Sequence, residues 1–343
     1  MSARYQSLSQ PRVAVVGATG AVGIELIRCL EQRNFPLSSL RLLASKRSAG
    51  RTLPFRGQEI AVEELNDANI RDIDLALFSA GSGPSKQFGP LTVARGGVVV
   101  DNSSAFRMDD DVPLVVPEIN PDALEGHKGI IANPNCAAII SITPLWPLHR
   151  RNPIRRLIIS TYQAASGAGA AAMEELRLST QAYLAGETYQ HTVLPHPYAF
   201  NLFSHNTAID PATGYNGEES KVIAESRKIF GAPDLPISAT CVRVPVLRAH
   251  SVSITAEFTD AITPDTARRL IADAPGVRLV DDAVGNYFPM PIDASGQDDI
   301  LVGRIRQDLS DPSGRSLNLF VAGDQLLKGA ALNAVQIAEL LLK

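Results

Sequence analysis

One cysteine of the sequence stands in a context that favours nucleophilic chemistry. Cys136 follows the turn residues Asn133-Pro134-Asn135 and precedes a helical pattern, so we expect it at the start of a helix. A helix N-terminus stabilises a thiolate through its dipole and its unpaired N–H groups, and the same groups can hold an oxyanion. Cys29 and Cys241 are expected to be small buried apolar residues. The sequence therefore predicts one reactive thiol, Cys136.

A glycine-rich loop near the N-terminus predicts a dinucleotide site. The loop has G-x-x-G-x-x-G spacing, follows a short apolar strand and opens a helix. Glycines let the backbone turn tightly and approach a pyrophosphate, which then faces the N-terminus of the helix. The residues that we assign to this contact are Gly17, Ala18, Thr19, Gly20, Ala21 and Val22.

The end of the second expected strand indicates which dinucleotide binds. An NAD site usually places an acidic residue there to hold the ribose 2′-hydroxyl. This chain has Ser45-Lys46-Arg47-Ser48 instead, with two cations and no carboxylate. Arg47 and Ser48 are suited to a 2′-phosphate, so the sequence favours NADP.

Local sequence patterns do not identify the acid–base partner of the thiol. A nucleophilic thiol needs an acid–base partner, and the candidates are His127, His149, His191, His196, His205 and His250. No metal-binding spacing stands out, and we expect no metal cofactor.

Alternating strands and helices predict the fold of the first part of the chain. Short apolar strands are expected at residues 12–16, 39–44, 75–79 and 98–101, with helices at residues 21–33 and 85–95. This alternation is typical of a parallel sheet covered on both faces. We therefore expect an α/β, doubly wound, Rossmann-type dinucleotide-binding domain.

The pattern changes after Cys136. A helix over residues 139–149 is expected to kink or end near Pro144 and Pro147. Strands are then expected at residues 154–162, 238–244, 252–258 and 316–322, and helices at residues 170–184, 218–230 and 263–272. This order suggests an inserted α+β domain with an antiparallel or mixed sheet. A final apolar helix, residues 326–342, is expected to pack on the first domain, which gives boundaries of 1–136 plus 324–343 and 137–323.

Composition limits the classes of function. The chain has 343 residues, 45% hydrophobic and 20% charged, with a net charge of -4. Two globular domains are expected at this length, and a mildly acidic chain makes nucleic acid an improbable partner. No apolar run is long enough to span a membrane, and three cysteines without a C-x-x-C pair suggest a reducing, cytoplasmic location.

Several ordered motifs make the sequence similar to the aspartate-semialdehyde dehydrogenase family along essentially its whole length. The matching segments are residues 15–23, 133–136, 162–167, 216–221, 243–250 and 323–333. Residues 198–206, Tyr-Ala-Phe-Asn-Leu-Phe-Ser-His-Asn, look most like the plant and cyanobacterial branch.

The resemblance implies roles for residues that are unremarkable singly. Cys136 would form an acyl-thioester, His250 would be the acid–base group, and Gln163 would orient the substrate carbonyl; Asn135 belongs to the same catalytic motif. The substrate α-carboxylate and amino group would be bound by Arg243 and Glu218, and phosphate by Arg107 and Lys221. Ser166, Gly167 and Gln325 would contribute to the NADP site.

The implied reaction is NADPH-dependent reduction of L-4-aspartyl phosphate to L-aspartate 4-semialdehyde and phosphate, in lysine, threonine and methionine biosynthesis. Family members are usually homodimers, and some are tetramers. The nearest alternative is N-acetyl-γ-glutamyl-phosphate reductase, which would share the loop and the thiol but usually has a His-Pro-Gly-Cys motif. A non-catalytic cofactor-binding paralogue would be expected to lose Cys136, Gln163 or His250, and all three are present.

Overall fold

The protein is described by a computed structural model that covers residues 8–342. The chain divides into two compact units, residues 1–135 with 330–343 and residues 136–329. Within residues 8–342, no helix is long and apolar enough to cross a membrane.

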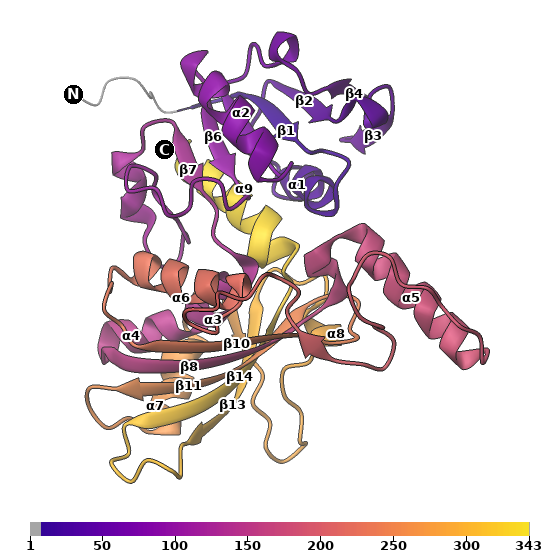
Figure 1. The fold of residues 1–343 in the computed structure, drawn as a ribbon. Helices are drawn as coiled ribbons and strands as arrows, with labels where there is room; N and C mark the ends of the chain where they lie inside the picture. Colours follow the sequence, from indigo (N-terminus) through magenta and orange to yellow (C-terminus); the bar gives the residue numbers. More distant parts are fainter. Residues whose placement is uncertain (1–7, 343) are drawn as a thin grey trace. The chain divides into compact units, whose positions relative to one another are not determined.

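The first unit contains one sheet of seven strands, in the order β3-β4-β2-β1-β5-β6-β7 (Figure 1). All neighbouring strands are parallel except the β3–β4 pair. The strands are β1 (Arg12–Val16), β2 (Ser39–Ala44), β3 (Thr52–Phe55), β4 (Gln58–Glu64), β5 (Leu75–Phe78), β6 (Val98–Asp101) and β7 (Ile130–Ala132). Every residue of β5 and β6 is buried, so both faces of the sheet are covered, as expected for a doubly wound domain.

Three helices complete the first unit: α1 (Ala21–Gln32), α2 (Ser82–Ala94) and α9 (Leu332–Leu340). Helix α2 packs on β5, β6 and β7, and α9 packs on α1, β5 and β6. The predicted single helix over residues 326–342 is wrong in its first turns. The backbone forms a wider π-helical turn at Leu327–Ala331 before α9 begins, and the Gly329 N–H bonds to the Asp324 carbonyl five residues earlier.

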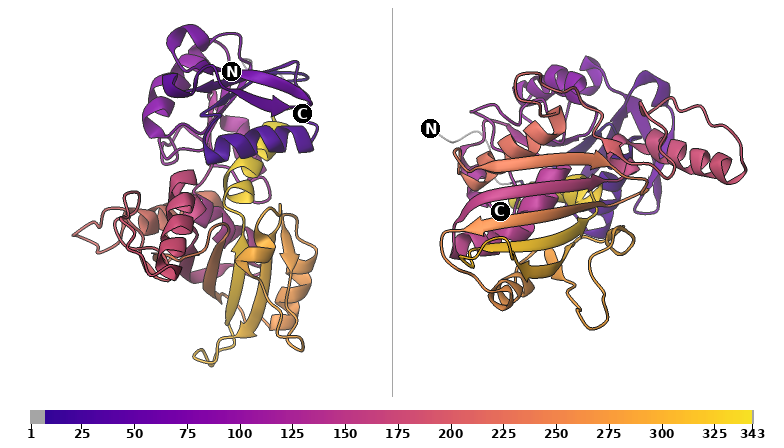
Figure 2. Two further views of the ribbon diagram at one scale, coloured as in Figure 1. Left: turned by 90° about the vertical axis from the view of Figure 1, so that its right-hand side faces the viewer. Right: turned by 60° about the horizontal axis from the view of Figure 1, so that its bottom comes forward.

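The second unit contains a mixed sheet of seven strands, in the order β12-β13-β14-β11-β8-β10-β9. The right-hand view of Figure 2 looks onto this sheet and shows its long strands side by side. The strands are β8 (Ile154–Gln163), β9 (Phe203–Ser204), β10 (Ile237–Arg243), β11 (His250–Phe258), β12 (Val277–Leu279), β13 (Ile300–Gln307) and β14 (Ser316–Gly323). Pairs β8–β10 and β12–β13 are parallel, and the other pairs are antiparallel. The expected mixed sheet is confirmed; β13, which lies inside it, was missed by the sequence reading.

The second unit also contains several helices, and some of them pack on this sheet. They are α3 (Cys136–Ile142), α4 (Trp146–Arg151), α5 (Ala170–Leu184), α6 (Gly217–Phe230), α7 (Pro264–Ala272) and α8 (Pro291–Ala294). The predicted break near the two prolines is confirmed, because a short turn, Thr143–Leu145, separates α3 from α4. Helix α3 contacts α6, β8, β11 and β14, which places its first residue, Cys136, against the sheet.

Candidate active site

Cys136 and His250 form a close pair in the second unit. Cys136 is the first residue of α3, and its Sγ lies 3.6 Å from Nε2 of His250, the first residue of β11. The other ring nitrogen, Nδ1, accepts the backbone N–H of Ala164 at 3.0 Å. A neutral imidazole carries one proton, so that proton is on Nε2 and faces the sulfur.

His250 is held in the neutral form by its surroundings. Its side chain is fully buried, and burial, aided by the positive charge of Arg243, lowers the pKa of His250 to about 3. A neutral Nε2–H is a hydrogen-bond donor to a thiolate, so the pair is suited to a cysteine that reacts as the anion.

Two glycines make this close packing possible. A Cβ atom at Gly167 would lie 2.9 Å from His250 Cε1 and 3.1 Å from Arg243 Nη1. A Cβ atom at Gly329 would lie 2.8 Å from the Cβ of Cys136. Any other residue at either position would displace the reactive pair or Arg243.

The backbone that leads into His250 has an unusual conformation. Ala249 has a positive φ of 72°, which is costly for a residue with a Cβ and therefore needs support from its surroundings. The Ala249 N–H donates to Gln325 Oε1 at 2.9 Å, and Gln325 Nε2 donates to the hydroxyl of Ser166. Ser166 and Gln325, which we expected in the cofactor site, thus also support the start of β11.

Strand pairing brings Gln163, Arg243 and His250 to one end of the sheet. Gln163 and Arg243 are the last residues of the parallel strands β8 and β10, and they are partners in the register. Strand β11 runs antiparallel to β8, so its first residue lies where β8 ends. The topology therefore assembles three predicted site residues that are far apart in the sequence.

The N-terminus of α6 adds an acidic and a basic side chain. Asn216 caps the helix and forms a reciprocal capping box with Glu219, whose side chain also accepts the Cys241 N–H of β10. Glu218 is 5% exposed and accepts Gln163 Nε2 at 3.3 Å. Lys221 Nζ lies 3.6 Å from Glu218 Oε2, so these two residues share a face as predicted.

Arg243 is a buried cation bound by neutral groups. Its side chain is 4% exposed and burial lowers its pKa. Three N–H groups donate to Asn206 Oδ1 at 3.3 Å, Ala164 O at 3.3 Å and His205 Nε2 at 2.8 Å. A guanidinium has five N–H groups, so two remain available. Among the residues that the structure describes, no carboxylate forms an ion pair with Arg243, which suits it to an anionic ligand.

The glycine loop and the basic turn lie together in the first unit. Gly17 has a φ of 87°, and a Cβ there would lie 2.3 Å from Ser79 O; a Cβ at Gly23 would lie 2.1 Å from Gly17 O. The α1 N-cap, Gly20, provides no side-chain cap, and the first turn has no acidic residue, so a phosphate fits this helix start. Thr19 donates to Ser48 at 3.2 Å, which links the loop to the turn carrying Arg47.

Arg107 and Asn135 also belong to the first unit. Arg107 is 8% exposed, and its guanidinium donates to the carbonyls of Asn133 at 3.0 Å and Asn102 at 2.7 Å. Asn133 is three residues before Cys136 in the chain, and its side chain accepts Asn333 Nδ2 at 2.7 Å. Arg107 therefore helps to order the turn that leads to the cysteine.

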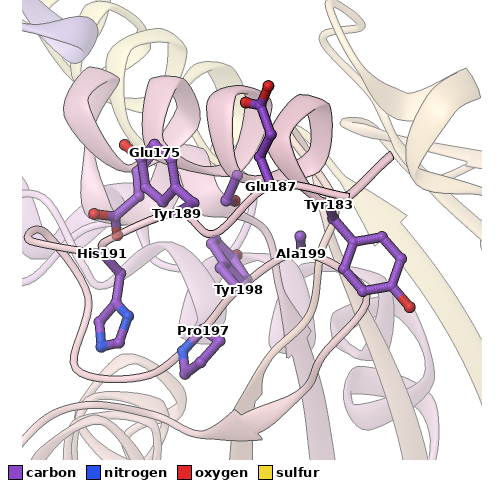
Figure 3. Close-up of a pocket in the computed structure, with 9 residues that line it drawn as sticks. Glu175, Tyr183, Glu187, Tyr189, His191, Pro197, Tyr198 and Ala199 are labelled. Atoms are coloured by element: carbon purple, nitrogen blue, oxygen red, sulfur yellow. The ribbon is translucent and has the colours of Figure 1, made fainter. Parts of the chain in front are cut away.

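A pocket of about 130 Å³ lies between α5 and the loop that follows it (Figure 3). Glu175 of α5, 2% exposed, accepts the backbone N–H groups of Thr192, Val193 and Leu194 and so anchors this loop. Tyr198, also in the pocket wall, is 1% exposed, and burial raises its pKa to about 12. The loop continues into His205, Asn206 and Thr207.

Sequence reasoning missed several residues of this site. It placed no role on Ala164, Asn206, Thr207 or Gly329, and it named His205 only as one of six candidate acid–base partners of the thiol, although the matched motifs included most of these residues. Their contribution is a backbone group, a neutral acceptor or a missing side chain, and such features leave no compositional signal. Among residues 8–342, no cluster of His, Cys, Asp or Glu suited to a metal ion occurs.

Comparison with known protein families covers most of the chain. Residues 12–127 match the model described as semialdehyde dehydrogenase, NAD binding domain. Residues 145–328 match the model described as semialdehyde dehydrogenase, dimerisation domain.

Individual relatives match over nearly the full length. The chain is 55% identical to the aspartate-semialdehyde dehydrogenase of Synechocystis sp. over 97% of each chain. It is 51% identical to that of Prochlorococcus marinus over 96% of this chain and 95% of the relative. Among solved structures, aspartate semialdehyde dehydrogenase II from Vibrio cholerae, complexed with ASA, superposes with a TM-score of 0.94 at 40% identity, over 98% of this chain and 99% of that chain.

Proposed function

The chain belongs to the aspartate-semialdehyde dehydrogenase family, and we propose that its reaction proceeds through a thioester on Cys136. The reaction is the NADPH-dependent reduction of L-4-aspartyl phosphate to L-aspartate 4-semialdehyde and phosphate, in the biosynthesis of lysine, threonine and methionine. The observation that carries the proposal is the 3.6 Å contact between Cys136 Sγ and His250 Nε2, beside the buried cation Arg243.

Cys136 acts as the nucleophile. Its thiolate attacks the acyl phosphate carbon, and phosphate leaves with the electrons of the C–O bond, which forms the thioester. Bound NADPH supplies the hydride that reduces this thioester. The resulting thiohemiacetal oxyanion collapses to the aldehyde and expels the thiolate. His250, with Nε2–H directed at the sulfur, stabilises the thiolate before attack and after collapse, which is the acid side of the acid–base role that we assign to it. Asn135 belongs to the same turn.

The substrate is recognised as an α-amino acid. Arg243 binds the α-carboxylate with its two remaining N–H groups. Glu218 binds the amino group, because its buried carboxylate carries the opposite charge. Gln163, hydrogen-bonded to Glu218, orients the carbonyl beside Cys136.

The phosphate group is bound by two cations. We assign Arg107 and Lys221 to it, and the support is their chemistry, since guanidinium and ammonium groups are the usual ligands of phosphate oxygens. The side chain of Lys221 is 37% exposed although it pairs with Glu218, so its ammonium group can reach an incoming anion.

The cofactor is NADP. Residues 17–22 would hold the pyrophosphate, and Arg47 with Ser48 would hold the 2′-phosphate. The supports are the uncapped start of α1 and the hydrogen bond from Thr19 to Ser48. We also assign Ser166, Gly167 and Gln325 to NADP, as the family resemblance implies; within the second unit, Gln325 donates a hydrogen bond to Ser166.

Assembly and location complete the proposal. Residues 1–136 with 324–343 bind the cofactor, and residues 137–323 carry catalysis and the homodimer contact; the family model for residues 145–328 is described as a dimerisation domain. Light scattering would distinguish a dimer from a tetramer. A cytoplasmic location agrees with the three cysteines, none of which is in a disulfide within residues 8–342.

A steady-state assay tests the function. Purified protein, phosphate and NADP should form NADPH with L-aspartate 4-semialdehyde and far less with N-acetylglutamate 5-semialdehyde. Preference for the N-acetylated aldehyde would contradict the substrate assignment, and absence of turnover with both would contradict the enzyme assignment.

A further inference from the structure

His205 makes the shortest hydrogen bond that Arg243 forms. Its Nε2 lies 2.8 Å from Arg243 Nη2. A guanidinium only donates, so His205 Nε2 must be the acceptor and must carry a lone pair. The proton of the neutral ring is therefore on Nδ1, which lies 3.2 Å from Thr207 Oγ1.

Thr207 continues the chain of contacts to α6. Its Oγ1 accepts the backbone N–H of Glu218 at 3.0 Å and lies 3.4 Å from Asn216 Oδ1, the helix cap. The hydrogen bonds thus run from the guanidinium through His205 and Thr207 to the residue whose carboxylate is proposed to bind the substrate amino group.

Only the neutral ring can make this bond. His205 is 7% exposed, and burial, followed by the charge of Arg243, lowers its pKa to about 4. An imidazolium would lack the acceptor at Nε2 and would place a second positive charge against the guanidinium.

The backbone of His205 is fixed independently of its ring. Its N–H donates to Cys241 O at 2.9 Å, and Phe203, two residues earlier, pairs with Arg243 in the β9–β10 register. Phe203 also packs against Tyr198. Tyr198 belongs to the loop that Glu175 anchors, and Figure 3 shows both of these residues in the pocket wall. Substitution of the ring therefore removes its hydrogen bonds while the segment keeps its place.

We propose that His205 is a positioning residue for substrate recognition. It fixes the plane of the Arg243 guanidinium so that the two remaining N–H groups face the α-carboxylate, and through Thr207 it sets that plane relative to the start of α6. The spacing between carboxylate and amino group that the site accepts is thereby determined by residues that do not touch the substrate. The inference rests on the proposed function, in which Arg243 binds the carboxylate.

Three variants of His205 test the role. His205→Leu removes both hydrogen bonds at similar volume. His205→Gln keeps a neutral acceptor that reaches the Nε2 position, whereas His205→Asn keeps an amide that reaches only the Nδ1 position. We expect kcat/KM for L-aspartate 4-semialdehyde to fall at least tenfold in the leucine and asparagine variants, with recovery to within a few-fold of wild type in the glutamine variant.

The other kinetic constants supply the controls. The KM values for phosphate and NADP should change less than twofold, since neither ligand is assigned to Arg243. His196→Leu, an exposed histidine in the same segment, should keep wild-type kinetics. If the leucine variant does not fold, the comparison of glutamine with asparagine decides the question, because the two amides differ only in reach.

An Arg243→Ala background separates this inference from the proposed function. His205→Leu should have no further effect there, because His205 acts through Arg243. Wild-type kinetics in Arg243→Ala alone would overturn the carboxylate assignment. A strong defect in Arg243→Ala together with wild-type kinetics in His205→Leu, or equal defects in the glutamine and asparagine variants, would overturn the positioning role and leave the function standing.

Discussion

Replacement of Arg243 by lysine tests how the site recognises its substrate. Arg243 is buried and donates to three neutral acceptors, Asn206, Ala164 and His205, which leaves a planar pair of N–H groups for a carboxylate. Lysine keeps the positive charge, but its three donors radiate from one atom and cannot reproduce the fork.

The size of the effect follows from the bonds lost. The lysine variant keeps the Coulomb attraction and loses at least one charge-assisted hydrogen bond, worth about 1.5 to 3 kcal/mol. At about 1.4 kcal/mol per factor of ten, kcat/KM for L-aspartate 4-semialdehyde should fall roughly 10- to 150-fold. The KM for phosphate should change little.

Phosphate-dependent NADPH formation, followed by absorbance, measures both constants. Arg269→Lys is the matched control, since Arg269 is exposed on α7 and this variant should behave as wild type. If Arg243→Lys kept wild-type kcat/KM, or if its phosphate KM rose as much as its aldehyde KM, the carboxylate fork would be refuted.

Further predictions concern the thiol, the cofactor, the buried histidine and the close-packed glycine. Cys136→Ala should abolish phosphate-dependent NADPH formation while calorimetric NADP binding is retained, and Cys136→Ser should keep at most slight activity; more than a trace in the alanine variant would refute the nucleophile. Arg47→Ala should raise the KM for NADP by roughly ten- to a hundredfold more than that for NAD, because only NADP carries the extra phosphate; equal effects would contradict the contact. The folded pKa of His250 is about 3, against 6.5 when unfolded, so below pH 6.5 the unfolded chain takes up a proton that the native ring does not and stability falls. When the pH falls from 7.5 to 5.5, the free energy of unfolding measured with urea should therefore decrease by about 1.4 kcal/mol less in His250→Asn than in wild type. An equal decrease in the two proteins would argue against a neutral buried ring. Gly167→Ala should lower kcat more than tenfold, since its Cβ would meet the His250 ring at 2.9 Å; normal turnover would show that the ring can move at no cost.

Local features of the chain were predictable because neighbouring residues determine them. The glycine loop could be assigned from spacing, because a strand, a tight turn and a helix start follow one another along the chain. The start of a helix at Cys136 and the break before α4 likewise depend on adjacent residues. Strand β13 was not predicted, because the first four of its residues are all buried and show no alternation of apolar and polar side chains.

The partner of the thiol was decided only by the tertiary structure. Six histidines were equivalent as local sequence, and only the resemblance to a family favoured His250. The antiparallel pairing of β11 with β8 brings its first residue to the end of the sheet where Gln163 and Arg243 lie. Strand register joins residues that are distant in sequence, and local composition does not encode it.

The sequence by itself determined a dinucleotide loop, a helix-start cysteine, the alternating first domain and, through resemblance, the chemistry. It did not determine the protonation of the histidine rings in the site, which depends on burial and on the donors that each ring meets. The Ala164 N–H occupies Nδ1 of His250, so the proton of that ring is on Nε2 and faces the sulfur. Arg243 occupies Nε2 of His205, so the proton of that ring is on Nδ1 and faces Thr207. A proton's position depends on which atoms meet in space, so only the folded chain could decide it.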